Sequence, residues 1–191
     1  YYDARRRALA GKCSEEEVYK IEMLMNQAGI TVHDRPVVDA ALSRAEETEA
    51  PAAALELADG RMITGKTTDL LGPCAALLLN ALKELAGIPH SQPVISPAAI
   101  EPIQTLKTQY LGSKNPRLHM DEVLIALSVS AASDPNAQKA LEQLPNLKGC
   151  QAHTSVMVSD VDRKLFMKLS IQATFEAKYE NNSVIFSKKG I

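Results

Sequence analysis

The chain has 191 residues, of which 46% are hydrophobic and 23% charged, which is the composition of an ordinary globular protein. Its 21 Lys and Arg residues are balanced by 23 Asp and Glu residues, and the formal net charge of −2 provides no field to hold nucleic acid. Three widely spaced cysteines, Cys13, Cys74 and Cys150, exclude a disulfide framework and predict reduced thiols in a cytoplasmic protein. The longest apolar run, residues 74–79, is far too short to cross a membrane, and no signal peptide is visible.

Residues 1–50 predict a helical adaptor ahead of the main body. The chain opens inside a helical pattern, which suggests a fragment that begins within an element. Ser14 and Glu17 have the spacing of a capping box at the start of one helix, and Gly29 is expected to end it. Asp34 is expected to cap a second helix.

The body, residues 51–178, combines two kinds of strand pattern with helices. Residues 53–65 predict a β-hairpin with its turn at Asp59-Gly60. Residues 74–85 are apolar nearly all round, which is typical of a buried central helix, and Gly72-Pro73 suits its first positions.

Further helices are predicted after a Pro-containing linker at residues 87–96, and they span residues 103–111, 121–132 and 135–144. The last third predicts a strand at 150–158, a helix at 159–169 and a strand at 171–177, which form a βαβ unit with parallel strands. The predicted fold class is therefore α+β: a helix-rich sandwich with a β-hairpin and a C-terminal βαβ unit around a buried central helix. Residues 179–191 form a tail without a recognisable pattern.

Residues 60–67 match the phosphate-loop pattern G-x-x-x-x-G-K-T. A phosphate loop needs a flexible turn after a strand, and its Lys and Thr must open a helix. Met62 and Ile63 instead favour a strand, and Gly72-Pro73 places the helix start several residues too late. The pattern is more consistent with a β-hairpin than with a nucleotide site.

The candidate site residues are polar side chains scattered along the body. The candidates for ligand binding are Lys66, Thr67, Asp69 and Arg117, and those for catalysis are His153, His119 and Lys66. The ordinary alternatives are turn formation for the first group, a satisfied strand histidine for His153, and helix-dipole complementarity at the helix start that follows His119. No spacing of His, Cys, Asp and Glu predicts a metal site.

The segment from Gly72 to Ala76 superficially resembles the nucleophile segment of Lon-type serine–lysine peptidases. Cys74 stands where those enzymes have serine, and an alanine replaces the glycine that follows. A small residue packed in a buried helix explains Cys74 equally well. A peptidase would require Cys74 or Ser155 to meet Lys66 or His153 within hydrogen-bond distance.

Several long segments resemble one bacterial family. They are residues 54–60, 65–67 and 77–83; residues 100–103, 110–119 and 121–124; residues 148–150 and 152–153; and residues 14–29. These segments are similar to the uncharacterised family that carries the domain of unknown function eighteen-forty-six, and the resemblance extends to about Lys178.

The resemblance implies that the chain is the C-terminal portion of a larger bacterial protein. Family members have an N-terminal α/β part with its own glycine-rich, phosphate-loop-like segment, so any nucleotide is expected to bind outside this chain. Some members are labelled ATP-dependent peptidases, but the resemblance supplies no catalytic residue that can be carried over.

Two functional hypotheses follow, and they leave open whether the chain is part of an enzyme. In the first, the chain is an accessory or oligomerisation domain that packs on a nucleotide-handling N-terminal part or on a second copy of itself. In the second, it shares an active site for hydrolysis or phosphate-compound chemistry with the missing part. The second hypothesis requires several polar side chains to converge in one cleft, namely Lys66, Asp69, Arg117, His119 and His153.

Overall fold

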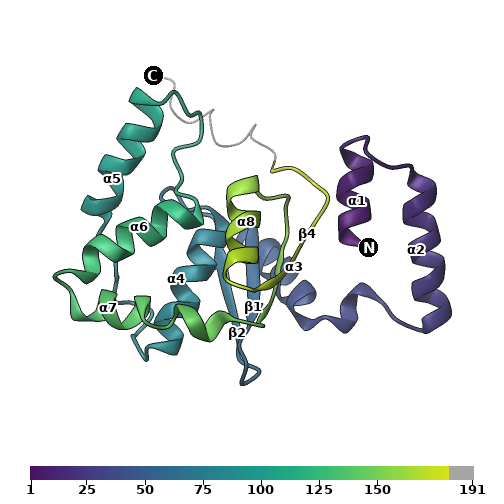
Figure 1. The fold of residues 1–191 in the computed structure, drawn as a ribbon, viewed down its shortest axis with the longest axis horizontal. Coiled ribbons are helices and arrows are strands. Elements are labelled where there is room, and N and C mark those ends of the chain that lie inside the picture. The colour runs from purple at the N-terminus through teal and green to yellow at the C-terminus, as the bar shows by residue number, and fades with distance from the viewer. Residues whose placement is uncertain (181–191) are drawn as a thin grey trace.

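An open four-stranded mixed sheet lies at the centre of the computed structural model, which describes residues 1–180 (Figure 1). Its strands are β1 (Ala52–Glu56), β2 (Met62–Lys66), β3 (Gln151–Thr154) and β4 (Gln172–Phe175), in the order β2-β1-β3-β4. β1 pairs antiparallel with both β2 and β3, whereas β3 pairs parallel with β4. The structure confirms the predicted hairpin and the predicted βαβ unit, and shows that they share one sheet rather than forming separate layers.

Eight α-helices and three short helical turns surround this sheet in the described residues. The helices are α1 (Tyr2–Leu9), α2 (Glu15–Ala28), α3 (Pro36–Thr48), α4 (Pro73–Leu85), α5 (Pro97–Thr105), α6 (Met120–Ala131), α7 (Pro135–Leu141) and α8 (Asp160–Lys168). The turns are η1 (Val32–Asp34), the π-helical η2 (Leu106–Tyr110) and η3 (Leu144–Leu147). The α+β class is confirmed.

The two faces of β1 are covered by different helices. Successive side chains of a strand point to opposite faces. Ala53 and Leu55 belong to the main hydrophobic cluster, which also contains the buried face of α4. Ala52 and Ala54 are fully buried as well, and α3 packs against β1, β2 and β3. Helices therefore exclude water from both faces of β1. The small alanine side chains of β1 let the helices pack close to the strand.

Two predicted helix caps are wrong. The Ser14 side chain makes no capping hydrogen bond, and Glu17 instead forms a two-pronged pair with Arg7 at 2.8 and 3.2 Å, which joins α2 to α1. Asp34 accepts a hydrogen bond from the Thr31 amide at 2.6 Å within η1, whereas α3 begins after Arg35. In both cases the carboxylate accepts hydrogen bonds from another nearby group, the Arg7 side chain or the Thr31 amide, and does not cap the predicted helix.

Some element boundaries also differ from the prediction. α5 begins at Pro97, because Ser96 caps it by accepting from the Ala99 amide at 3.2 Å, and the predicted start at residue 103 is therefore too late. β3 ends at Thr154, earlier than predicted, and the Thr154 hydroxyl donates to the carbonyl of Val156 two residues further on at 2.6 Å. The predicted domain boundary at residue 50 stays a prediction, and of the predicted tail, residues 181–191 lie outside the described residues.

The second glycine of the phosphate-loop pattern has a packing role. A Cβ atom on Gly65 would lie 2.2 Å from the backbone nitrogen of Leu77 in α4, so only glycine lets β2 approach this helix so closely. Gly60 occupies the hairpin turn with a φ of +85°, a conformation that glycine adopts without strain. Both glycines are explained by the fold.

We expect Gly65→Ala to lower the free energy of unfolding by about 2 kcal/mol or more, because the added methyl group forces α4 away from the sheet. Gly72→Ala is the matched control, since its Cβ would meet its nearest atom, the Leu118 carbonyl oxygen, at an ordinary 3.7 Å. Urea unfolding of both variants measures the difference. Equal stability of the two variants would contradict the packing role of Gly65.

Candidate functional site

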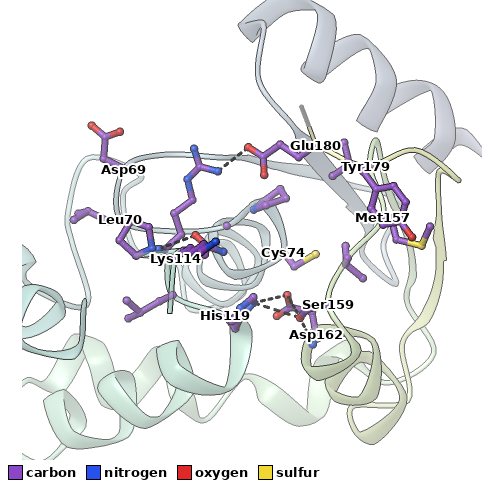
Figure 2. Close-up of a pocket in the computed structure, with 18 of the residues that line it drawn as sticks. Asp69, Leu70, Cys74, Lys114, His119, Met157, Ser159, Asp162, Tyr179 and Glu180 are labelled. Carbon is purple, nitrogen blue, oxygen red and sulfur yellow. Dashed lines mark hydrogen bonds and ion pairs between the residues drawn. The ribbon is translucent and has the colours of Figure 1, made fainter. Parts of the chain in front are cut away.

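A cleft of about 1060 Å³ opens where the first turns of α4, α6 and α8 meet (Figure 2). Its walls come from the loop before α4, the loop before α6, the segment between β3 and α8, and residues Tyr179 and Glu180. The loops before α4 and α6 are joined by a parallel bridge, in which the Leu118 amide donates to the Leu70 carbonyl at 2.9 Å and the Gly72 amide donates to the Leu118 carbonyl at 3.2 Å. This bridge holds two walls of the cleft together.

Asp162 is the centre of a hydrogen-bonded cluster on the cleft wall. Its side chain is only 9% exposed, and its carboxylate accepts from His119 Nδ1 at 2.9 Å and from the Ser159 hydroxyl at 2.9 Å. The Met120 amide donates to the other carboxylate oxygen at 2.8 Å. Figure 2 shows His119 turned toward Ser159 and Asp162. The cluster therefore connects the start of α6 with the start of α8.

Local sequence explains why these groups stand at helix starts. Ser159 is the N-cap of α8 and accepts from the Asp162 amide at 3.1 Å, as a Ser in this position commonly does. His119 precedes the first residue of α6, and its amide donates to Glu122 at 2.7 Å. The polar side chains thus serve the helix ends and also face the cleft.

The His119–Asp162 pair has the arrangement of a histidine prepared for proton transfer. The hydrogen bond to Asp162 is the main reason why the pKa of His119 is raised above its ordinary value, while partial burial acts in the opposite direction. Since Asp162 holds Nδ1, Nε2 is the nitrogen left to exchange a proton with a ligand. The His119 side chain is 27% exposed, so a ligand in the cleft can reach it.

Arg117 lies two residues before His119 and is the most buried cation of the cleft wall. Its side chain is 12% exposed and donates to the Glu180 carboxylate at 2.6 Å. Lys107 of η2 supports this segment from behind, because its buried ammonium group donates to the Arg117 carbonyl at 2.5 Å and to Glu122 at 2.7 Å. The segment that carries Arg117 and His119 is therefore fixed at several points.

The structure brings together three of the five side chains that the shared-site hypothesis requires: Asp69, Arg117 and His119 all line the cleft. Lys66 and Thr67 are not among its lining residues. Lys66 is exposed at the end of β2, and Thr67 is buried beside Pro51, whose carbonyl accepts from its amide at 2.8 Å. A role for Lys66 or Thr67 in this cleft is therefore not supported.

His153 lies in the sheet, outside the cleft. It is 0% exposed, its Nδ1 contacts the Thr174 hydroxyl at 2.8 Å, and the Tyr2 ring packs on it with a centroid distance of 4.8 Å. Its Nε2 lies 3.5 Å from Glu176 and makes no hydrogen bond among residues 1–180. This is the environment of a structural histidine that helps α1 to pack on the sheet.

The pairs required for a serine–lysine or cysteine peptidase are not formed in residues 1–180. The Ser155 hydroxyl is buried and accepts from the Ala52 amide at 2.9 Å. Burial, with a smaller contribution from the negative charge of Asp162, raises the pKa of the Cys74 thiol well above its ordinary value. Cys74 therefore remains a protonated thiol at neutral pH and is a poor nucleophile.

Ser159 and Asp162 are cleft residues that the sequence prediction missed. They follow β3 in the chain, Ser159 in the connection to α8 and Asp162 in the first turn of α8, and ligand sites of parallel α/β units commonly lie beyond the carboxyl ends of the strands. The predicted βαβ unit could have directed attention to this position. The partnership with His119 spans 43 residues, however, and no local pattern reveals it.

No group of three or more His, Cys, Asp and Glu side chains in residues 1–180 is arranged to hold a metal ion. No helix of the same residues is long and apolar enough to cross a membrane.

Comparison with known proteins places this chain in a family. The model of the domain of unknown function DUF1846, C-terminal, matches residues 33–185. The chain belongs to the DUF1846 family. It is 55% identical over 165 residues to a UPF0371 protein of Corynebacterium glutamicum strain R, which covers 86% of this chain and 33% of that protein. It is 47% identical over 180 residues to a UPF0371 protein of Streptococcus pneumoniae strain CGSP14, which covers 94% of this chain and 36% of that protein.

The chain thus spans about a third of the length of these DUF1846 relatives. The relatives are longer proteins, of which the region matched by this chain is one part, as the sequence resemblance implied. The cleft described here belongs to the C-terminal domain of the family.

We expect the pKa of His119 to lie above the ordinary histidine value of about 6.5. The Asp162→Asn substitution should lower the pKa of His119, because it removes the charged acceptor. NMR titration of the His119 ring measures both values. Asp160→Asn is the matched control, since this exposed residue of the same helix pairs with Arg163 instead. Equal His119 pKa values in Asp162→Asn and wild type would contradict the assigned hydrogen bond.

The same shift links pH to folding. Because the folded pKa of His119 is raised, its contribution to stability is fully present below the unfolded pKa and is lost as the pH rises through the folded value. The stability difference between wild type and His119→Gln should therefore shrink as the pH rises above neutrality.

Proposed function

We propose that this chain supplies the acid–base part of an active site that the rest of the polypeptide completes. The supporting observation is the His119–Asp162 pair, with its 2.9 Å hydrogen bond, on the wall of a large cleft. Such a histidine donates or accepts a proton in hydrolysis and group transfer, and positioned groups of this kind accelerate reactions by roughly 10²–10⁴-fold. Since relatives of this chain are about three times as long, the remaining polypeptide has ample length to close the cleft.

The other groups of the cleft favour general acid–base catalysis over covalent catalysis by this chain. The Ser159 hydroxyl donates to Asp162 and caps α8, so it is already engaged. Cys74 is buried, and the raised pKa of its thiol keeps it protonated. His119 is therefore the residue that exchanges protons with the substrate, and Asp162 acts as its positioning residue.

The test uses the complete gene product and a panel of hydrolysable phosphate esters, phosphate anhydrides and carboxylic esters. We expect His119→Asn to lower kcat by about 10²-fold or more with a smaller change in KM, because the proton-transfer group is lost while binding contacts remain. Asp162→Asn should move the pH profile of kcat to lower pH, since it lowers the pKa of His119.

His33→Asn is the matched control, because His33 and Asp39 form a second histidine–carboxylate pair on the exposed surface, outside the cleft. Its turnover should equal that of the wild type. Unchanged turnover in His119→Asn would sink the proposal.

The accessory-domain hypothesis keeps one supporting observation. Ile125 and Val129 lie one turn apart on α6 and are 62% and 68% exposed, although α6 is otherwise strongly apolar and packed. Neighbouring exposed apolar side chains on a helix favour contact with another protein surface. We propose that this face of α6 packs against a second copy of the chain.

If α6 forms that contact, Val129→Asp should shift the complete gene product to a smaller assembly in size-exclusion chromatography with light scattering. The reason is that a buried unpaired carboxylate costs several kcal/mol. Gln138→Asp adds the same charge at an exposed polar position of α7 and serves as the control. Identical masses for wild type and Val129→Asp would remove the support for this interface.

A further inference from the structure

Arg117 already holds an anion, and that anion belongs to the chain itself. Its side chain is 12% exposed, and its guanidinium donates to Glu180 at 2.6 Å. Glu180 lies beyond β4, far along the chain from Arg117, and enters the cleft together with Tyr179 (Figure 2). A largely buried guanidinium that takes a carboxylate from a distant segment indicates a position built for an oxyanion.

Further positive charge surrounds this position. Lys114 lines the same cleft, and its ammonium group forms no ion pair within residues 1–180. The first turn of α4, from Gly72 to Cys74, also lines the cleft, and no side chain of the described residues caps it. The 13-residue α4 directs the positive end of its dipole toward the same space.

Two of the three carboxylates that line the cleft are already paired within the chain. Asp162 pairs with His119, and Glu180 pairs with Arg117. Asp69 is exposed at the edge of the cleft, where Figure 2 shows its carboxylate turned outward. Lys114 and the α4 terminus remain, so a ligand with more charge and more oxygens than one carboxylate would satisfy the site better than Glu180 does.

We propose that the cleft binds the phosphate group of its ligand through Arg117 and Lys114, and that Glu180 occupies the phosphate position when the ligand is absent. The planar guanidinium offers two parallel donors to phosphate oxygens, and Lys114 supplies a second cation. This inference rests on the proposed function, because a phosphate bound at Arg117 lies beside the segment that carries His119. It assigns the substrate class as phosphate-bearing compounds.

Binding of inorganic phosphate and of pyrophosphate to the full 191-residue chain tests the inference, measured by calorimetric titration at low salt with acetate as the comparison anion. We expect Arg117→Ala to weaken pyrophosphate binding at least tenfold and Lys114→Ala to weaken it several-fold. Glu180→Gln should tighten binding several-fold, because it removes the competing carboxylate. Arg163→Ala is the matched control, since Arg163 pairs with Asp160 outside the cleft, and it should bind as wild type does.

Some results would overturn the inference. They are equal binding by wild type, Lys114→Ala and Arg117→Ala; acetate binding as tight as that of pyrophosphate; or no pyrophosphate binding by either wild type or Glu180→Gln. Lys114 is exposed, so Lys114→Ala keeps the test decisive if Arg117→Ala fails to fold, and Arg117→Lys provides a second, milder change.

His119→Asn separates this inference from the proposed function. It should leave pyrophosphate binding within about threefold of wild type while turnover of the complete gene product falls. Binding as expected with unchanged turnover would refute only the acid–base role, and lost turnover without phosphate binding would refute only the substrate class.

Discussion

The buried carboxylate of Asp162 joins two parts of the chain that the sequence separates by more than 40 residues. It accepts hydrogen bonds from His119 and from the Met120 amide at the start of α6, and from Ser159 at the start of α8. A buried carboxylate needs such donors, because an unpaired one costs several kcal/mol. The requirement that stabilises the packing of α8 against α6 therefore also fixes the histidine at the cleft wall.

Most of the secondary structure could be predicted, because it depends on local patterns. The alternation around Asp59-Gly60 predicted the hairpin, and the change of period after residue 149 predicted the βαβ unit. The caps were less predictable. Glu17 pairs with Arg7 of another helix, and Asp34 closes η1, so tertiary and short-range competitors outweighed the capping pattern. The hairpin and the βαβ unit share one sheet because β1 pairs with β3. No local sequence pattern predicts that pairing, since the two strands lie far apart in the chain.

The candidate site was only partly predictable. Arg117, His119 and Asp69 could be selected by their residue types and by a polar loop before a helix, and the cleft contains them. Lys66 was selected as one of several polar side chains that precede a buried helix, but it is exposed at the end of β2 and does not line the cleft. His153 is buried beside Tyr2 and does not line the cleft, which could not be foreseen because residue type alone does not reveal whether a strand position faces solvent, a cleft or a packed helix.

The groups in the cleft also constrain what the remaining polypeptide must contribute. The Ser159 hydroxyl is committed to Asp162, and the Cys74 thiol stays protonated. In the proposed role His119 exchanges protons through Nε2 and Arg117 holds an anion, so neither is free to attack a phosphate or an acyl centre. In an enzyme built on this cleft, the attacking group is therefore water or a substrate hydroxyl activated by His119, or a side chain from the part of the polypeptide that closes the cleft. The two proposals assign the acid–base role and the phosphate-binding role to this chain, and they leave the nucleophile to water, to the substrate or to the rest of the polypeptide.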